Sequence, residues 1–199
     1  MGLRLPQTER VRAFAIAAAL LIAGALILAL QAPPVPTAHA AADCSASAWR
    51  SWQPVAGRHY RAEAFSSGPT CALAVVTLVV RAPDGHALWT DAAPAEHLMT
   101  FGEVKTRAQM VRALGEWVSQ AHMFRTTAEL PAWKKGDDAP TSGEFPFYPE
   151  AGVDREYYEQ TRAERLPVFC YVQGMESMSC VALSKDGQMT KVGVQTFPG

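Results

Sequence analysis

The sequence predicts an α+β fold in which two groups of about three antiparallel strands pack against one or two α-helices and are stapled by two disulfides. Three observations support this prediction. Runs rich in β-branched residues occur in both halves of the chain, with helical patterns between them. Asp-Gly pairs separate successive apolar runs, as expected for hairpin turns. All four cysteines lie after residue 40.

The first forty residues are predicted to be a targeting segment. Three arginines precede an uncharged run of 18 residues from Ala13 to Leu30. A polar stretch follows and ends in the small-x-small pattern of Ala38 and Ala40, which is typical of a signal-peptide cleavage site. The apolar run is also long enough to span a bilayer, so an uncleaved N-terminal membrane anchor is the alternative. Both interpretations place the domain in the periplasm, free or attached to the inner membrane only through this segment.

Residues 41–199 are predicted to form a single extracytoplasmic domain, because their number is sufficient for one hydrophobic core. The chain has a net charge of −1, and the predicted leader holds three arginines and one glutamate, so the rest of the chain is more acidic than the whole. Domains that bind nucleic acids usually carry a basic surface. The composition therefore argues against a nucleic-acid partner, and it does not predict the oligomeric state.

The cysteines are predicted to form two disulfides, as is typical of an even number of cysteines in an exported chain. Pairing within each half of the chain joins Cys44 to Cys71 and Cys170 to Cys180, which is one of three alternatives. The segment FCYVQGMESMSC separates the last two cysteines by an even number of residues and has a central glycine. It predicts a disulfide-closed hairpin with a loop at 174–176.

The first group of strands is predicted at residues 58–92. β-Branched and apolar runs at 58–65, 71–80 and 86–91 are separated by turn residues, the last of them an Asp-Gly pair. These runs predict a three-stranded meander. A second group of three strands is predicted after residue 167.

Two helices are predicted between the groups of strands. Thr106 and Gln109 form a capping-box pattern at the start of a helix at 106–120. A more polar helix is predicted at 154–165, with Asp154 as its N-cap. The first helix has an apolar stripe that we expect to face the sheet. The stripe consists of Ala108, Val111, Leu114 and Val118, with Met110 and Trp117 near its edges.

Residues 124–149 are predicted to form a long irregular loop, because they contain four prolines and show no periodicity. The segment has too many aromatic residues for a free linker, and aromatic side chains are enriched in binding hot spots. We therefore predict that the loop binds a protein or an envelope component; the alternative is that its aromatic residues cover the core. The candidate binding residues are Trp133, Phe145, Phe147 and Tyr148.

The sequence contains no motif for catalysis, a metal or a cofactor. The histidines lack metal-ligand spacing, no nucleophile elbow occurs, and paired cysteines leave no free thiolate. These observations favour a non-catalytic binding module. One alternative is a small exported hydrolase whose site is assembled from His59, Glu96 and His97. Another is copper or redox handling at Met175 and Met178, because thioethers are suitable ligands for Cu(I).

Overall fold

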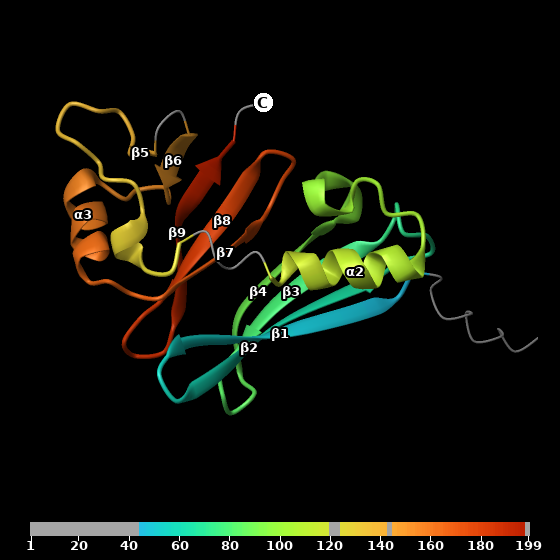
Figure 1. The fold of residues 1–199 in the computed structure, drawn as a ribbon. Helices are drawn as coiled ribbons and strands as arrows, with labels where there is room; N and C mark the ends of the chain where they lie inside the picture. Colours follow the sequence, from blue (N-terminus) through green and yellow to red (C-terminus); the bar gives the residue numbers. More distant parts are fainter. Residues whose placement is uncertain (1–43, 120–123, 143–144, 198–199) are drawn as a thin grey trace, which may run out of the picture. The chain divides into compact units, whose positions relative to one another are not determined.

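Two antiparallel sheets make up most of the described chain (Figure 1). The computed structural model describes residues 44–119, 124–142 and 145–197, so the leader predicted at 1–40 lies outside the described residues. The first sheet has the strand order β1-β2-β3-β4, and the second has the order β5-β6-β9-β8-β7. This arrangement confirms the predicted α+β class with antiparallel meanders.

The first sheet is a meander of four strands rather than three. Its strands are β1 (Ala46–Val55), β2 (Arg58–Ser67), β3 (Val75–Arg81) and β4 (Ala87–Pro94). The additional strand, β1, pairs with β2 along its length. Three of its inward residues are Ala46, Ala48 and Arg50, so the apolar alternation that reveals a half-buried strand is too weak to recognise.

Short helical segments and one α-helix follow the first sheet. They are η1 (Ala95–His97), η2 (Met99–Phe101) and α2 (Arg107–Trp117). The predicted capping box is present at the start of α2, where the Thr106 side chain accepts a hydrogen bond from the Gln109 backbone and the Gln109 side chain accepts one from the Thr106 backbone. The helix packs across β1 and β2.

The buried face of α2 is rotated from the predicted one. Val111 was placed in the apolar stripe but is exposed, as is Ala108, whereas Met110 and Trp117 are buried. The reason is the size and bonding of Trp117. Burying its ring removes much more apolar surface from water than burying a valine, and its indole N–H donates to the carbonyl of Val172 at 2.8 Å.

The remaining elements build the second sheet and its cover. They are η3 (Thr127–Glu129), β5 (Thr141–Ser142), β6 (Phe145–Pro149), α3 (Arg155–Ala163), β7 (Val168–Val172), β8 (Ser177–Leu183) and β9 (Met189–Thr196). The prediction of an irregular loop at 124–149 is therefore wrong at its end, where β6 pairs with β9. Gly193 permits this pairing, because a Cβ there would lie 2.4 Å from the Tyr148 carbonyl oxygen and its φ is +153°.

Aromatic residues join the two sheets. Phe169 and Tyr171 on β7 point towards the inner face of the first sheet. Phe169 packs edge-on against Trp52 with ring centroids 5.4 Å apart. The Tyr171 hydroxyl donates to Asp91 at 2.7 Å and accepts from the Trp89 indole at 3.0 Å. The polar ends of these buried rings are therefore satisfied, and the interface belongs to one continuous core.

Both predicted disulfides are present, joining Cys44 to Cys71 and Cys170 to Cys180. Each has its sulfurs within the core, and the second links two directly paired residues of β7 and β8, as the hairpin prediction required. Two disulfides and no free cysteine among the described residues indicate an oxidising, extracytoplasmic environment. Within the described ranges, no helix has the length and apolar character needed to cross a membrane.

Candidate functional site

The segment that connects α2 to β6 holds α3 in place. Trp133 packs edge-on against Tyr158 of α3 with ring centroids 5.9 Å apart, and its backbone N–H donates to Glu159 at 2.6 Å. Arg162 donates to the same carboxylate and to the carbonyl of Leu130. These contacts cover the core, which is the alternative considered for this segment.

Phe147 is not available to a partner. It is 0% exposed and lies in the core beneath β6, with its ring 6.0 Å from that of Tyr158. Its assignment as a partner-binding residue is therefore corrected. The physical reason is the alternation of side chains along β6, which directs Phe147 inwards and Tyr148 outwards.

The other predicted binding residues retain some exposure. Tyr148 is 52% exposed on the outer side of β6. Phe145 is half-buried against Phe197, and Trp133 is half-buried with its indole N–H bound to the Asp137 carbonyl. The structure thus leaves Tyr148 as the member of this set that presents most of its side chain to solvent.

The residues considered for a hydrolase do not meet. His59 lies at the end of the first sheet where β4 begins, at Ala87. Glu96 and His97 follow Pro94, where β4 ends. A strand of this length spans about 25 Å, so the two histidines lie at opposite ends of the sheet. His59 instead shares a hydrogen bond with Gln53 at 3.0 Å.

The two methionines considered as copper ligands, Met175 and Met178, lie in different environments. Met178 pairs with Val172 inside the hairpin and is buried, whereas Met175 at the hairpin tip is exposed. The described residues contain no cluster of three or more His, Cys, Asp or Glu side chains that could hold a metal ion.

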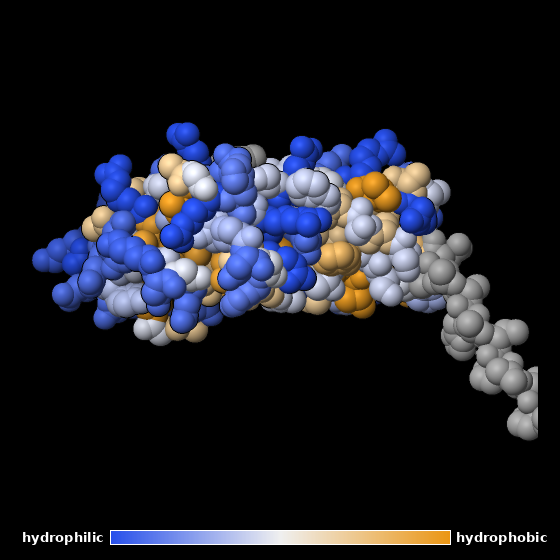
Figure 2. Space-filling view, turned by 90° about the horizontal axis from the view of Figure 1, so that it is seen from below, coloured by the Kyte–Doolittle hydropathy of each residue, from blue (hydrophilic) through white to orange (hydrophobic). Residues whose placement is uncertain are grey.

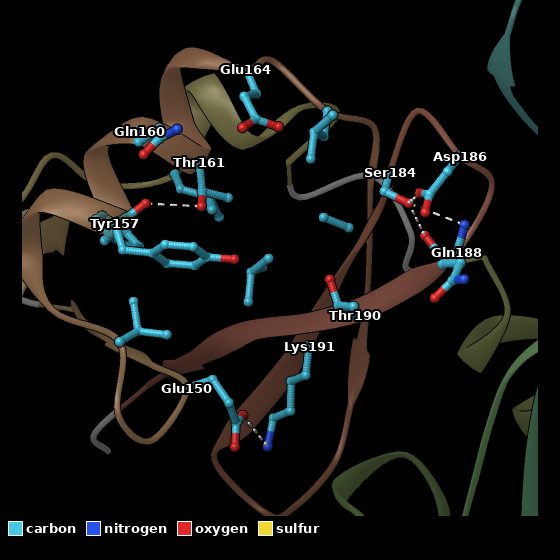
Figure 3. Close-up of a pocket in the computed structure, with 16 residues that line it drawn as sticks. Glu150, Tyr157, Gln160, Thr161, Glu164, Ser184, Asp186, Gln188, Thr190 and Lys191 are labelled. Atoms are coloured by element: carbon cyan, nitrogen blue, oxygen red, sulfur yellow. Dashed lines mark hydrogen bonds and ion pairs between the residues drawn. The ribbon is translucent and has the colours of Figure 1, made fainter.

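A pocket of about 380 Å³ lies between α3 and the strands β8 and β9 (Figure 3). This size is at the lower end of the range of small-molecule sites. Its apolar lining is contributed by both sides of the pocket and by the segments that join them. The apolar residues of the lining are Leu130, Val153, Tyr158, Leu166, Ala182 and Val192.

α3 places two side chains in the pocket that the fold itself does not use. The helix begins at the N-cap Asp154, whose carboxylate accepts from the Tyr157 backbone at 2.8 Å. Tyr157 is 62% exposed, and its ring and hydroxyl are directed into the pocket. The carboxylate of Glu164 at the end of α3 also points inwards, and none of the described residues forms an ion pair with it.

The opposite wall of the pocket is polar and largely self-satisfied. Lys191 and Glu150 form an ion pair with a 3.3 Å separation between Nζ and Oε2. The Ser184 hydroxyl donates to Asp186 and lowers the pKa of that exposed carboxyl group. Its oxygen also accepts from the Gln188 backbone N–H at 3.1 Å, so the hydroxyl is engaged in closing the β8–β9 turn.

The charges around the pocket are predominantly negative. Three carboxylates, on Glu150, Glu164 and Asp186, face one lysine. Because Lys191 is paired with Glu150, the carboxylate of Glu164 remains available to a cation. The Tyr157 ring adds a face that attracts cations through its quadrupole. The pocket can therefore hold a group that combines a positive charge with an apolar stem.

A second exposed surface is the outer face of the first sheet, which we call the open face. Figure 2 views the molecule from below and shows apolar residues gathered where this sheet lies. Trp49, Phe65 and Val75 project from this face and are substantially exposed. The guanidinium of Arg61 lies 4.6 Å from the centre of the Trp49 ring.

The open face also contains a charged cluster. The Glu63 carboxylate accepts from Arg61 at 3.0 Å and from Arg81 at 2.8 Å. These two guanidinium groups explain how a glutamate can be nearly buried in the centre of the sheet.

Sequence reasoning did not identify the pocket. Tyr157 and Glu164 occur in a polar helix whose residues give no chemical motif, and their partners come from strands far along the chain. Comparisons with models of known protein families, with curated proteins and with solved structures gave no match to this chain.

Proposed function

We propose that the protein is a non-catalytic extracytoplasmic binding module, located in the periplasm or held at the inner membrane by residues 1–40. Its ligand is a small cationic group, such as the ammonium or guanidinium of a lysine or arginine side chain. The observation that carries this proposal is the pocket between α3 and the second sheet, into which Tyr157 and Glu164 project without serving the fold.

Binding rather than catalysis is favoured by the state of the polar groups around this pocket. The Ser184 hydroxyl is committed to the β8–β9 turn, and the Lys191 ammonium is committed to Glu150. The pocket has no histidine in its lining. Its groups thus provide charge and an aromatic surface, which suit recognition, and its serine hydroxyl, although hydrogen-bonded to Asp186, is held in the β8–β9 turn.

The test uses acetyl-lysinamide and acetyl-argininamide as probes, with acetyl-glutamine amide as the uncharged control. We expect the two cationic probes to shift the amide resonances of Tyr157, Glu164 and Thr190 in NMR titrations. The shifts should decrease as salt increases, because the attraction is electrostatic.

Two variants distinguish binding in the pocket from binding at the exposed side of β6. Glu164→Gln should weaken binding of the cationic probes about tenfold or more, because it removes the negative charge that strengthens the hydrogen bond to the cation. Tyr148→Ala is the matched control, and it should bind like the unaltered protein. If Tyr148→Ala abolishes binding and Glu164→Gln does not, the binding surface is the exposed side of β6 and the pocket proposal is wrong.

A further inference from the structure

Two exposed methionines lie on either side of the hydrogen bond that joins the β7–β8 hairpin to the turn before α2. Met175 forms the tip of the hairpin and Met99 is the first residue of η2; each is 55% exposed. The Met99 backbone N–H donates to the Gly174 carbonyl at 3.2 Å. Standard backbone dimensions then place the Cα atoms of the two methionines within about 7.5 Å of each other.

The hairpin tip is fixed on both sides of Met175. Gly174 accepts from Met99, and the Glu176 carbonyl accepts from the Phe197 backbone at 2.9 Å. A Cβ at Gly174 would lie 2.8 Å from the Ser177 hydroxyl oxygen, so glycine lets the tip fold closely over that side chain. Met175 is therefore presented to solvent from a backbone that is already ordered, which lowers the entropic cost of binding.

His97 lies on the same side of the chain as Met99. The residue between them, Leu98, is buried and has an extended backbone with φ −115° and ψ +128°. Successive side chains of an extended backbone point to opposite sides. Because the Leu98 side chain points into the core, the side chains of His97 and Met99 both point towards solvent. The His97 side chain is exposed, and its Nε2 atom is 4.0 Å from the Glu96 carboxylate.

These three side chains form a set of soft and borderline donors. Thioethers select Cu(I), and imidazole also binds copper. Methionine side chains are long, unbranched and flexible, so two exposed methionines whose backbones are this close can direct their sulfurs towards one ion. Glu96 and Glu176, which flank His97 and Met175 in the sequence, add negative charge that favours a cation.

We propose that Met99, Met175 and His97 bind a soft monovalent cation of the Cu(I) type. The two sulfurs and one imidazole nitrogen donate lone pairs to the metal, and no electron is transferred. The buried Met178 takes no part. This site is separate from the pocket beside α3 and does not depend on the function proposed for it.

The first experiment uses Ag(I), a soft monovalent ion that needs no reductant and therefore leaves the disulfides intact. The full domain is labelled with ¹³C at the methionine methyl groups and titrated in chloride-free buffer. We expect the methyl resonances of Met99 and Met175 to shift together and to saturate at one equivalent. The methyl groups of the buried Met110 and Met178 should not shift.

The second experiment measures Cu(I) affinity by competition with a coloured chelator. We expect Cu(I) affinity to fall at least about tenfold in each of Met99→Leu, Met175→Leu and His97→Ala. Substituting a residue that only orients a metal ligand commonly causes a loss of this size, so the loss of a ligand should cause at least as much. Met178→Leu is the matched control and should bind normally. The substituted methionines are exposed, so unchanged melting temperatures are expected to show that the variants are folded.

Three outcomes would overturn the proposal. Failure of both Ag(I) and Cu(I) to bind would leave the exposed methionines as apolar surface only. Equal effects of Met178→Leu and Met175→Leu would place any site inside the hairpin. Normal Cu(I) affinity in Met99→Leu would exclude the bridging arrangement between η2 and the hairpin tip.

Discussion

The two sheets of the molecule differ in how their faces are covered. In the second sheet, every residue of β7 and all but the first residue of β8 are buried, so side chains on both faces are removed from water. In the first sheet, α2 and β7 cover one face, and the other face exposes Trp49 and Phe65. The segment from η3 to α3 packs beside the second sheet, and among the described residues no such segment lies over the outer face of the first.

Whether an aromatic residue on a strand is buried therefore depends on whether another element covers its face of the sheet, and not on its hydrophobicity alone. Phe147 and Trp49 are both aromatic residues on strands, yet the first is 0% and the second 58% exposed. The following predictions test the contrast, in order of decreasing effect.

The largest effect is expected for a residue under the cover of the second sheet. Phe147→Ala should lower the free energy of unfolding by about 3–5 kcal/mol, because it leaves a cavity in a packed core. Its neighbour Tyr148→Ala should change it by no more than about 0.5 kcal/mol, as is usual at the surface. Denaturant unfolding of both variants measures this difference. Comparable losses would show that the exposed side of β6 is also covered.

The two disulfides should differ according to the lengths of the loops that they close. Replacing Cys44 and Cys71, 27 residues apart, with alanines should lower the stability by about 3.5 kcal/mol in the loop-entropy model. Replacing Cys170 and Cys180, 10 residues apart, should lower it by about 2.7 kcal/mol. Calorimetry of the two double variants tests the order. The reverse order would mean that packing around the second bridge outweighs chain entropy.

Alkaline pH should weaken the interface between the sheets. Burial, followed by the hydrogen bond to Asp91, raises the pKa of Tyr171 above its usual value of 10.0. The folded state therefore favours the neutral phenol, so this stabilisation is complete below pH 10 and is lost as the pH rises above it.

Unfolding free energies measured from pH 8 to 11 should fall less steeply for Tyr171→Phe than for the unaltered protein. At neutral pH this variant should be less stable by about 1–3 kcal/mol, because Asp91 and Trp89 lose their common partner. Tyr148→Phe serves as the control on an exposed phenol. An identical pH dependence in Tyr171→Phe would contradict the assignment.

The smallest effect is expected on the open face. Trp49→Ala should lower the stability by about 0.5–1 kcal/mol, the value of an exposed cation–π contact with Arg61. Leu78→Ala on the covered face of the same sheet should lower it by about 2–5 kcal/mol. If Trp49→Ala were as destabilising as Leu78→Ala, and more so at high protein concentration, the open face would be covered by a second copy of the chain.

The contrast between the sheets also explains which parts of the fold the sequence could predict. β7 and β8 were predicted because strands buried on both faces consist of continuous apolar runs with clear turns between them. β1 was missed because two alanines and an arginine among its inward residues give almost no apolar alternation. The buried face of α2 was predicted incorrectly because the periodicity of apolar residues gives no information on how much surface each residue can bury.

The candidate site was less predictable than the fold. The aromatic segment at 124–149 attracted attention by composition, but composition cannot distinguish Phe147, which points inwards, from Tyr148, which points outwards. The pocket and the hydrogen bond between Met99 and Gly174 depend on pairings between segments distant in sequence. No local pattern reports such pairings.

The position of β9 has a consequence for how the chain can fold as it is made. β9 is the last described strand, yet it lies between β6 and β8 and pairs with both. The strand pairings of the first sheet and α2 use only residues up to Trp117, although β7 later completes the cover of their inner face. The second sheet must wait for residue 196, and until then β6 has no partner on the side where β9 will lie. The synthesis of β9 therefore decides when the second sheet can be completed.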